Sequence, residues 1–460
     1  MSTKDQAVIH QGDTGELHRC LTAFDLILLG VGAIIGAGIF VLTGIAAATK
    51  AGPAIMISFV IASIACAFSA FCYAELSSAI GGCGGAYDYA KTGFGRMVGW
   101  IIAWALILEY GISSAAVAVG WSGYLNTLLL SIGIQIPKPL LHGPFDHGII
   151  NLPALLIVAL IAAILVKGMQ QSARLNAIIV YIKLAVIALF IILAFRHINF
   201  SYWHDFAPFG VKGIASGAAF IFFAFIGFDA VSTAAEETIN PQRNLPIGIM
   251  GSLIICTLFY ILVSGLITLI APYQSLNDSS PIAHVLLGLG YNFVASIIAV
   301  GALAGLTTVI LVMYYGMTRI ILALSRDHLL PKSVATVHPK TKTPVRIIIV
   351  TFFVIGFGSA FVPIDTLVGL VNIGTLTAFT IVCAGVVVLR YTKPDMERPF
   401  KVPFSPVIPS LGVLTCLYLI YNQDVSIWIQ FIIWIAIGMI IYLAYGKNNK
   451  NKLSAPQVTT

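Results

Sequence analysis

The chain has 460 residues, of which 59% are hydrophobic and only 9% are charged. Soluble globular domains carry about 45–50% apolar and about 25% charged residues, so this composition excludes a soluble fold. The formal net charge of +7 could suggest binding of nucleic acid, and the positions of the 25 basic residues test that reading.

Apolar runs divide the chain into membrane-spanning lengths, since a transmembrane helix needs about 20 mostly apolar residues. They predict an all-α polytopic membrane protein with twelve transmembrane helices. In chain order the predicted spans are 22–48, 54–80, 97–128, 152–166, 176–195, 213–235, 246–271, 291–322, 347–362, 366–389, 405–422 and 426–445.

The basic residues report topology. With the N-terminus inside, 19 of the 25 fall in cytoplasmic segments, four in external segments and two within spans. Cytoplasmic loops carry such an excess of Lys and Arg. We therefore expect a multi-pass protein of the inner (plasma) membrane with both termini cytoplasmic, and no binding of nucleic acid. The first twenty residues lack the pattern of a removable signal peptide.

The sequence lacks the motifs for nucleotide, zinc and haem binding. No G-x-x-x-x-G-K-[ST] is present to cradle a nucleotide phosphate, and no C-x-x-C is present to hold zinc. All nine histidines fall in termini or loops, where they serve neither as haem ligands nor as a base within a span. We expect no cofactor, no metal site and no enzymatic activity, and any transport would be driven by a gradient.

Two spans carry signs of interrupted helices. The first span has four glycines between residues 30 and 38, each costing about 1 kcal/mol relative to alanine in a helix. The sixth span has Gly227 shortly before Asp229. Close helix packing through small residues is the alternative reading of the first run. Two broken helices, each first in a five-helix half, indicate an inverted repeat with its binding site at the breaks.

The chemistry of such breaks suits one class of ligand. The N-terminus of a half-helix presents free N–H groups to an anion, while unwound carbonyls accept from a cation. An α-amino acid carries both charges on neighbouring groups.

Five motifs then make the prediction specific. They are Gly-Ala-Ile-Ile-Gly-Ala-Gly-Ile-Phe at 32–40, Gly-Phe-Asp-Ala at 227–230, Asn-Pro-Gln-Arg at 240–243 with Pro-Ile-Gly at 246–248, Ser-Arg-Asp at 325–327 with Leu-Leu-Pro at 329–331, and Arg-Pro-Phe-Lys-Val-Pro at 398–403. In this order they resemble the amino acid–polyamine–organocation (APC) superfamily, most closely the bacterial relatives of the cationic amino acid transporters, over about residues 20 to 446.

This resemblance implies the fold of the leucine/sodium transporter, five plus five inverted helices with two more appended, and proton-coupled amino acid uptake. The implied segments are a cytoplasmic N-terminal segment 1–21, a first repeat 22–200, a second repeat 201–390, helices eleven and twelve in 391–446, and a cytoplasmic tail 447–460.

The resemblance also implies a substrate site. The substrate carboxylate would lie on the backbone around Ile34, Gly36, Ala37 and Gly38, and its amino group on the carbonyls of Phe223, Ala224 and Ile226. Ala37 stands where the family commonly has Ser or Thr, which removes one hydroxyl. The run 81–85 and His328 also depart from the family pattern. Met313 would lie in the side-chain pocket and shorten the space for arginine or lysine.

Charged residues within spans are candidates for function. Lys183 is about 13 Å along its helix, too deep for its stem to reach water comfortably, and the resemblance implies proton coupling there. Glu109 lies near the midplane and could face a cationic substrate, pass the proton or be a protonated structural group. Asp229 would cap the second half-helix, and Phe228 would gate the pocket. Glu75 and Arg319 read as paired groups at the cytoplasmic end.

The leading function is a secondary transporter that imports an α-amino acid with protons by alternating access, with small or neutral substrates favoured and cationic ones possible. An exchanger and a permease-like sensor remain alternatives. A channel would prefer rings of charge, which the sequence lacks. The expected partners are the amino acid, protons and membrane lipid, and the sequence predicts no oligomeric state.

Overall fold

The computed structural model describes residues 21–80, 85–168, 173–331, 336, 338, 341 and 343–446. The segment before Leu21, residues 81–84 of the glycine-rich run and the tail 447–460 lie outside the described residues.

Within these ranges the protein is all-helical, with one isolated bridge between Leu21 and Thr238 and no strands. The longer helices are α1 (Ala23–Ile34), α3 (Ile55–Ile80), α4 (Ala86–Phe94), α5 (Arg96–Ser131), α6 (Leu152–Val166), α7 (Ala173–Ala194), α8 (Gly210–Ile221), α9 (Pro241–Ile270), α10 (Pro281–Gly288), α11 (Asn292–Arg326), α12 (Val345–Phe361), α13 (Ile364–Thr392), α14 (Val407–Tyr421) and α15 (Val425–Ile441).

Eight helical stretches of the described residues are long and apolar enough to cross a membrane, as expected of a polytopic membrane protein. Four further apolar helices, α1, α6, α12 and α14, have 10–17 residues. Each of the ranges that the sequence predicts as spans contains helix, with interruptions inside 22–48 and 213–235, and crossing by the shorter helices stays a prediction.

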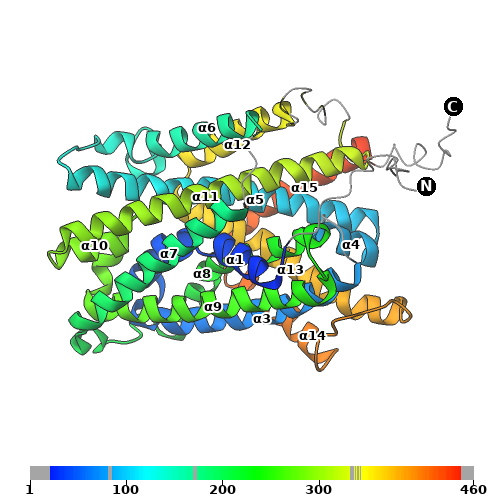
Figure 1. Cartoon of the computed structure of the whole chain (residues 1–460), viewed down its shortest axis with the longest axis horizontal. Helices are drawn as coiled ribbons and strands as arrows, with labels where there is room; N and C mark the ends of the chain where they lie inside the picture. The colour runs from blue at the N-terminus through cyan, green and yellow to red at the C-terminus, as the bar shows by residue number, and fades with distance from the viewer. Residues whose placement is uncertain are drawn as a thin grey trace, which may run out of the picture.

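The helices pack in two groups (Figure 1). In one group α9 packs against α1 and α3, and α3 packs against α8. In the other α5 packs against α6, α11 and α12, and α12 packs against α6. Two more helices join the groups: α7 contacts α1 and α11, and α13 contacts α3 and α5.

The chain enters α1 through a well-defined cap. The Thr22 hydroxyl accepts from the Asp25 N–H, and the Asp25 carboxylate accepts from the Thr22 N–H. This reciprocal pattern satisfies two N–H groups that a helix start otherwise leaves free. Leu21 also pairs with the backbone of Glu237 and Ile239, so the start of α1 is tied to the chain that follows the second break.

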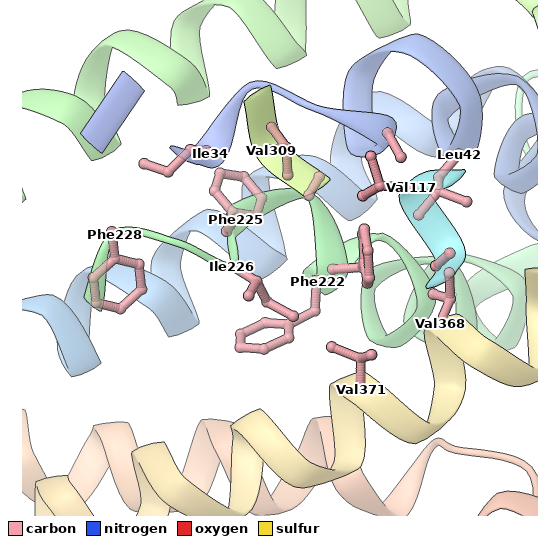
Figure 2. Close-up of a cluster of buried hydrophobic side chains, with 14 of the residues drawn as sticks. Ile34, Leu42, Val117, Phe222, Phe225, Ile226, Phe228, Val309, Val368 and Val371 are labelled. Atoms are coloured by element: carbon pink, nitrogen blue, oxygen red, sulfur yellow. The ribbon is translucent and has the colours of Figure 1, made fainter. Parts of the chain in front are cut away.

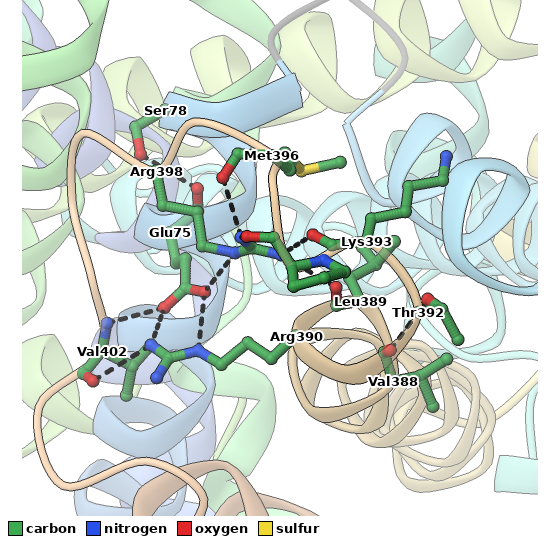
Figure 3. Close-up of polar contacts among 11 residues, drawn as sticks. Glu75, Ser78, Val388, Leu389, Arg390, Thr392, Lys393, Met396, Arg398 and Val402 are labelled. Atoms are coloured by element: carbon green, nitrogen blue, oxygen red, sulfur yellow. Dashed lines mark hydrogen bonds and ion pairs between the residues drawn. The ribbon is translucent and has the colours of Figure 1, made fainter.

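One buried carboxylate anchors the loop between α13 and α14 (Figure 3). Glu75, 1% exposed at the end of α3, accepts from Arg390 and from the Val402 N–H at 2.7 Å, and Arg398 lies 3.5 Å away. Glu75 is therefore a paired group, as expected. Arg319 instead bonds the hydroxyl of Tyr315 and lies over its ring.

A second polar contact joins α4 to the end of α11. Asp327 accepts from Lys91 at 2.7 Å and from the Tyr87 hydroxyl, and its carbonyl accepts from Arg96 at 3.0 Å. Partial burial acts to raise the pKa of Asp327, but the hydrogen bonds and charges of Lys91, Tyr87 and Arg96 outweigh it and hold that pKa below its usual 3.8. In Figure 1 this end of the bundle, marked by α4, lies opposite α10.

This contact should not contribute to pH sensitivity near neutrality. A carboxylate with a lowered pKa loses its stabilising effect only as the pH falls below its usual value of 3.8. We expect Asp327→Asn to change the rate of uptake by one constant factor from about pH 5 to about pH 8. Uptake measured at several pH values checks this, and a shifted midpoint in the variant's pH profile would contradict it.

Candidate substrate site

The first predicted break is present. The helix α1 ends at Ile34, where Ile35 turns to an extended conformation with ψ 99°, and a π-helical turn starts at Gly38 and runs to Leu42. Ile35 and Gly36 therefore separate two half-helices inside a buried region.

The second predicted break is also present. After α8 the chain forms a short 3-10 turn (Phe222–Phe225), Ile226 is extended with ψ 137°, and a 3-10 segment resumes at Asp229–Glu237. Gly227 has φ 115°, a conformation that L side chains rarely adopt. The glycine at this position is therefore required by the backbone.

The two breaks contact each other backbone to backbone. A Cβ built on Gly38 would lie 2.4 Å from the Cα of Ala224, and one built on Gly227 would lie 3.0 Å from the carbonyl of Ala33. Real Cβ atoms essentially never come as close as the first distance. Glycine at 38 thus permits the half-helices to meet.

Side chains from α7 and α9 satisfy the carbonyls that the first break frees. Lys183 is fully buried, and its ammonium donates to the carbonyls of Gly32 at 2.8 Å and Ile35 at 2.9 Å. Tyr260, also fully buried, lies within hydrogen-bond distance of the carbonyls of Ile34 (2.9 Å) and Ala224 (2.7 Å). One hydroxyl therefore bridges the two breaks.

From the sequence, Lys183 lies too deep in its helix for its side chain to reach water comfortably. Its side chain points to the break instead of extending to the membrane surface. A cation at the C-terminal end of α1 is also favoured by the helix dipole. The charge of this lysine therefore stabilises the interrupted conformation.

A cavity lies where the breaks meet, with a volume of about 10 Å³. This volume holds about one water molecule, so the site is closed in this conformation. Binding of a substrate requires the cavity walls to move apart. The cavity is lined by Ala33, Ile34, Gly36, Ala37, Gly38, Ser113, Val117, Phe223, Ile226, Val309 and Met313. Figure 2 shows the apolar side chains around it, among them Ile34, Val117, Ile226 and Val309.

The structure brings together seven of the nine predicted substrate residues at this cavity: Ile34, Gly36, Ala37, Gly38, Phe223, Ile226 and Met313. Ala224 and Glu109 do not line it. The carbonyl of Ala224 is instead taken by Tyr260.

The two residues predicted to gate or cap also lie outside the cavity wall. Phe228 packs against the rings of Tyr73 and Phe379, at centroid distances of 5.7 and 5.0 Å. Asp229 accepts from the Gly227 N–H at 3.2 Å and from the Tyr110 hydroxyl at 3.4 Å. Its carboxylate also lies near the backbone N–H groups of Asp229 and Ala230, so it stabilises the break at the start of the second half-helix.

Glu109 is fully buried, and among the described residues neither of its carboxylate oxygens has a hydrogen-bond partner. It lies within electrostatic range of Asp229, with the Thr375 hydroxyl nearby. Glu109 therefore belongs to a polar cluster beside the cavity.

Five residues of the site are absent from the sequence-based prediction. Ala33 directly precedes the predicted Ile34. Ser113 and Val117 follow Glu109 by four and eight positions, and Val309 precedes Met313 by four, so helical spacing could have found these three. Tyr260 has no such signal, because its partners are 226 and 36 residues away.

The chain matches the family model for amino acid permeases over residues 21–446. It is 45% identical to the methylthioribose transporter of Bacillus subtilis, covering 95% of this chain and 96% of that protein. It is 46% identical to the branched-chain amino acid permease BcaP of the same species, covering 94% of each. It is 31% identical to cationic amino acid transporter 1 of Arabidopsis thaliana, covering 94% of this chain and 83% of that protein. The chain therefore belongs to the amino acid permease family of the APC superfamily.

Proposed function

We propose that this permease is a secondary active transporter that imports a neutral α-amino acid with an aliphatic side chain, together with protons, by alternating access. The observation that carries the proposal is the cavity where the two breaks meet. Its wall is formed by residues of both breaks, whose backbones would supply N–H and carbonyl groups to an amino acid, and by apolar side chains. No charged side chain lines it within the described part of the chain.

The lining of the cavity supports a neutral aliphatic substrate, a choice that relatedness leaves open. The names of the relatives cover branched-chain amino acids, cationic amino acids and methylthioribose. A cationic side chain would need a carboxylate at the wall, and Glu109 lies outside it. Val117, Val309 and Met313 instead offer the hydrophobic surface that an aliphatic side chain prefers.

The proposed architecture is twelve transmembrane helices in a five-plus-five inverted repeat, with α14 and α15 appended. Its repeats are residues 22–200 and 201–390. The pairing of helices supports it, because each half gives two members to each packed group and its fifth helix, α7 or α13, joins the groups. Relative rocking of the groups would expose the breaks to either side in turn.

Uptake by the purified protein in proteoliposomes tests the function. We expect labelled leucine to accumulate when the outside is more acidic, with competition by valine and isoleucine but weakly by arginine. Uptake only against preloaded amino acid would identify an exchanger. Leucine binding without any flux would identify a sensor.

Met313 should set the size of the side-chain pocket. Met313 is a wall residue that is 3% exposed, and Met313→Ser is predicted to open the cavity towards the carboxylate of Glu109. Arginine or lysine should therefore gain binding while alanine binding is kept. Competition of a series of amino acids against labelled leucine measures the order of preference. An unchanged order in the variant would remove Met313 from the pocket.

A further inference from the structure

Ser113 is a buried hydroxyl without a partner at the substrate cavity. The residue is 2% exposed and lines the cavity, yet its Oγ has no hydrogen-bond partner within the described structure. Most buried polar groups in proteins are hydrogen-bonded, so a missing partner needs an explanation.

Two other hydroxyls of the same helix do find partners in the preceding turn. Ser114 donates to the carbonyl of Tyr110 at 2.8 Å, and Thr127 donates to that of Gly123 at 3.2 Å. This bond to the preceding turn is the common solution for a serine or threonine within a helix. Because Ser113 does not use it, its hydroxyl remains available to whatever enters the cavity.

The place of Ser113 in the cavity indicates which part of a substrate it meets. One part of the wall is formed by the two breaks, which offer the backbone groups suited to a carboxylate and an amino group. The other part is formed by α5, through Ser113 and Val117, and by α11, through Val309 and Met313. An amino acid held by the breaks would direct its side chain to this second part, where Ser113 carries the one side-chain polar group among the described lining residues.

We propose that the Ser113 hydroxyl forms a side-chain subsite that binds a hydroxyl on the substrate, so that the transporter takes β-hydroxy amino acids such as threonine beside aliphatic ones of equal size. The proposal rests on the proposed function and extends its substrate class. Threonine and valine have nearly the same shape, and they differ by a hydroxyl in place of a methyl group. An apolar pocket alone discriminates weakly between such isosteres, whereas a hydrogen-bonding group in the pocket favours the hydroxylated one.

The test compares threonine and valine as competitors of labelled leucine in the wild-type protein and in Ser113→Ala. We expect the affinity for threonine relative to valine to fall by about five- to tenfold in the variant, the size that one neutral hydrogen bond produces. Valine has no hydroxyl to bond Ser113, so its affinity should fall less than that of threonine.

Ser122→Ala is the matched control. Ser122 lies on the same helix, is 1% exposed and also lacks a hydrogen-bond partner, but it does not line the cavity. Its substitution should leave the ratio of the two affinities unchanged.

The outcomes separate this inference from the proposed function. An equal loss for threonine and valine in Ser113→Ala would place the hydroxyl on the common amino or carboxyl group, and an unchanged ratio would remove it from the subsite. Either result overturns the inference without contradicting the proposed function. A wild-type protein that takes up neither amino acid would instead contradict the proposed function.

The wild-type protein should also distinguish threonine from allothreonine, which differ in the configuration of the carbon that carries the hydroxyl. Equal affinities for threonine, allothreonine and valine would overturn the subsite without any variant.

Discussion

Gly38→Ala should abolish substrate binding, whereas Gly36→Ala should largely retain it. A methyl group at 38 would meet the Cα and Cβ of Ala224 at 2.4 Å, so the two breaks must separate. At 36 the nearest atom is a methyl of Val309 at 3.3 Å, which a small side-chain adjustment relieves. Displacement of a binding group by about 1 Å can cost on the order of 100-fold, and we expect at least that loss for Gly38→Ala.

Equilibrium binding of labelled leucine to the purified variants measures this difference. The thermal unfolding midpoint, recorded on the same samples, shows whether a variant that does not bind is still folded. Gly36→Ala is the matched control, because both glycines lie in the same break. Gly36→Val and Gly38→Val extend the series, and both should abolish binding. Wild-type affinity in a folded Gly38→Ala protein would count against a site between the breaks.

The breaks could be predicted because their signals are local. Four glycines in nine residues weaken a helix wherever they occur, and Gly227, two residues before Asp229, marks a second weak point. The burial of Lys183 was also predictable, since its depth in the membrane follows from counting residues along one helix. Features of this kind require no knowledge of which helices are neighbours.

The contacts across the site could not be predicted in this way. Tyr260 bridges carbonyls of two distant segments, and the carbonyl of Ala224 is occupied for that reason. Likewise, depth placed Glu109 near the midplane and left a substrate contact open as one of three roles, but the rotation of α5 presents Ser113 and Val117 to the cavity instead. These outcomes depend on how helices pack, and no short stretch of sequence determines that.

The neutral character of the proposed substrate follows from the same packing. The sequence left both a neutral and a cationic substrate open because Glu109 and Met313 pointed to different ligands. The cavity contains Met313 and excludes Glu109. The apolar wall therefore supports the proposed neutral substrate over the cationic one, which the sequence alone leaves equally open.

Lys183→Met should uncouple transport from the proton gradient. Its ammonium donates to the carbonyls of Gly32 and Ile35, so the charge of this group bears directly on the break that would hold the substrate carboxylate. Hydrogen bonds from a charged donor are about twice as strong as neutral ones, so release of the proton weakens the tie between α7 and α1. Methionine keeps the length and apolar volume of the side chain but has no proton to release.

Accumulation of labelled leucine at a fixed pH difference, with the membrane potential clamped at zero, gives the readout. One proton moving down a difference of one pH unit supplies about 1.4 kcal/mol, which supports about tenfold accumulation. We expect the wild type to approach that ratio and Lys183→Met to stop at equal concentrations. Exchange of labelled for unlabelled leucine should persist in the variant, which shows that the site is intact. Full accumulation by Lys183→Met would reject Lys183 as the coupling group and move that role to Glu109, the other buried titratable side chain predicted to pass the proton.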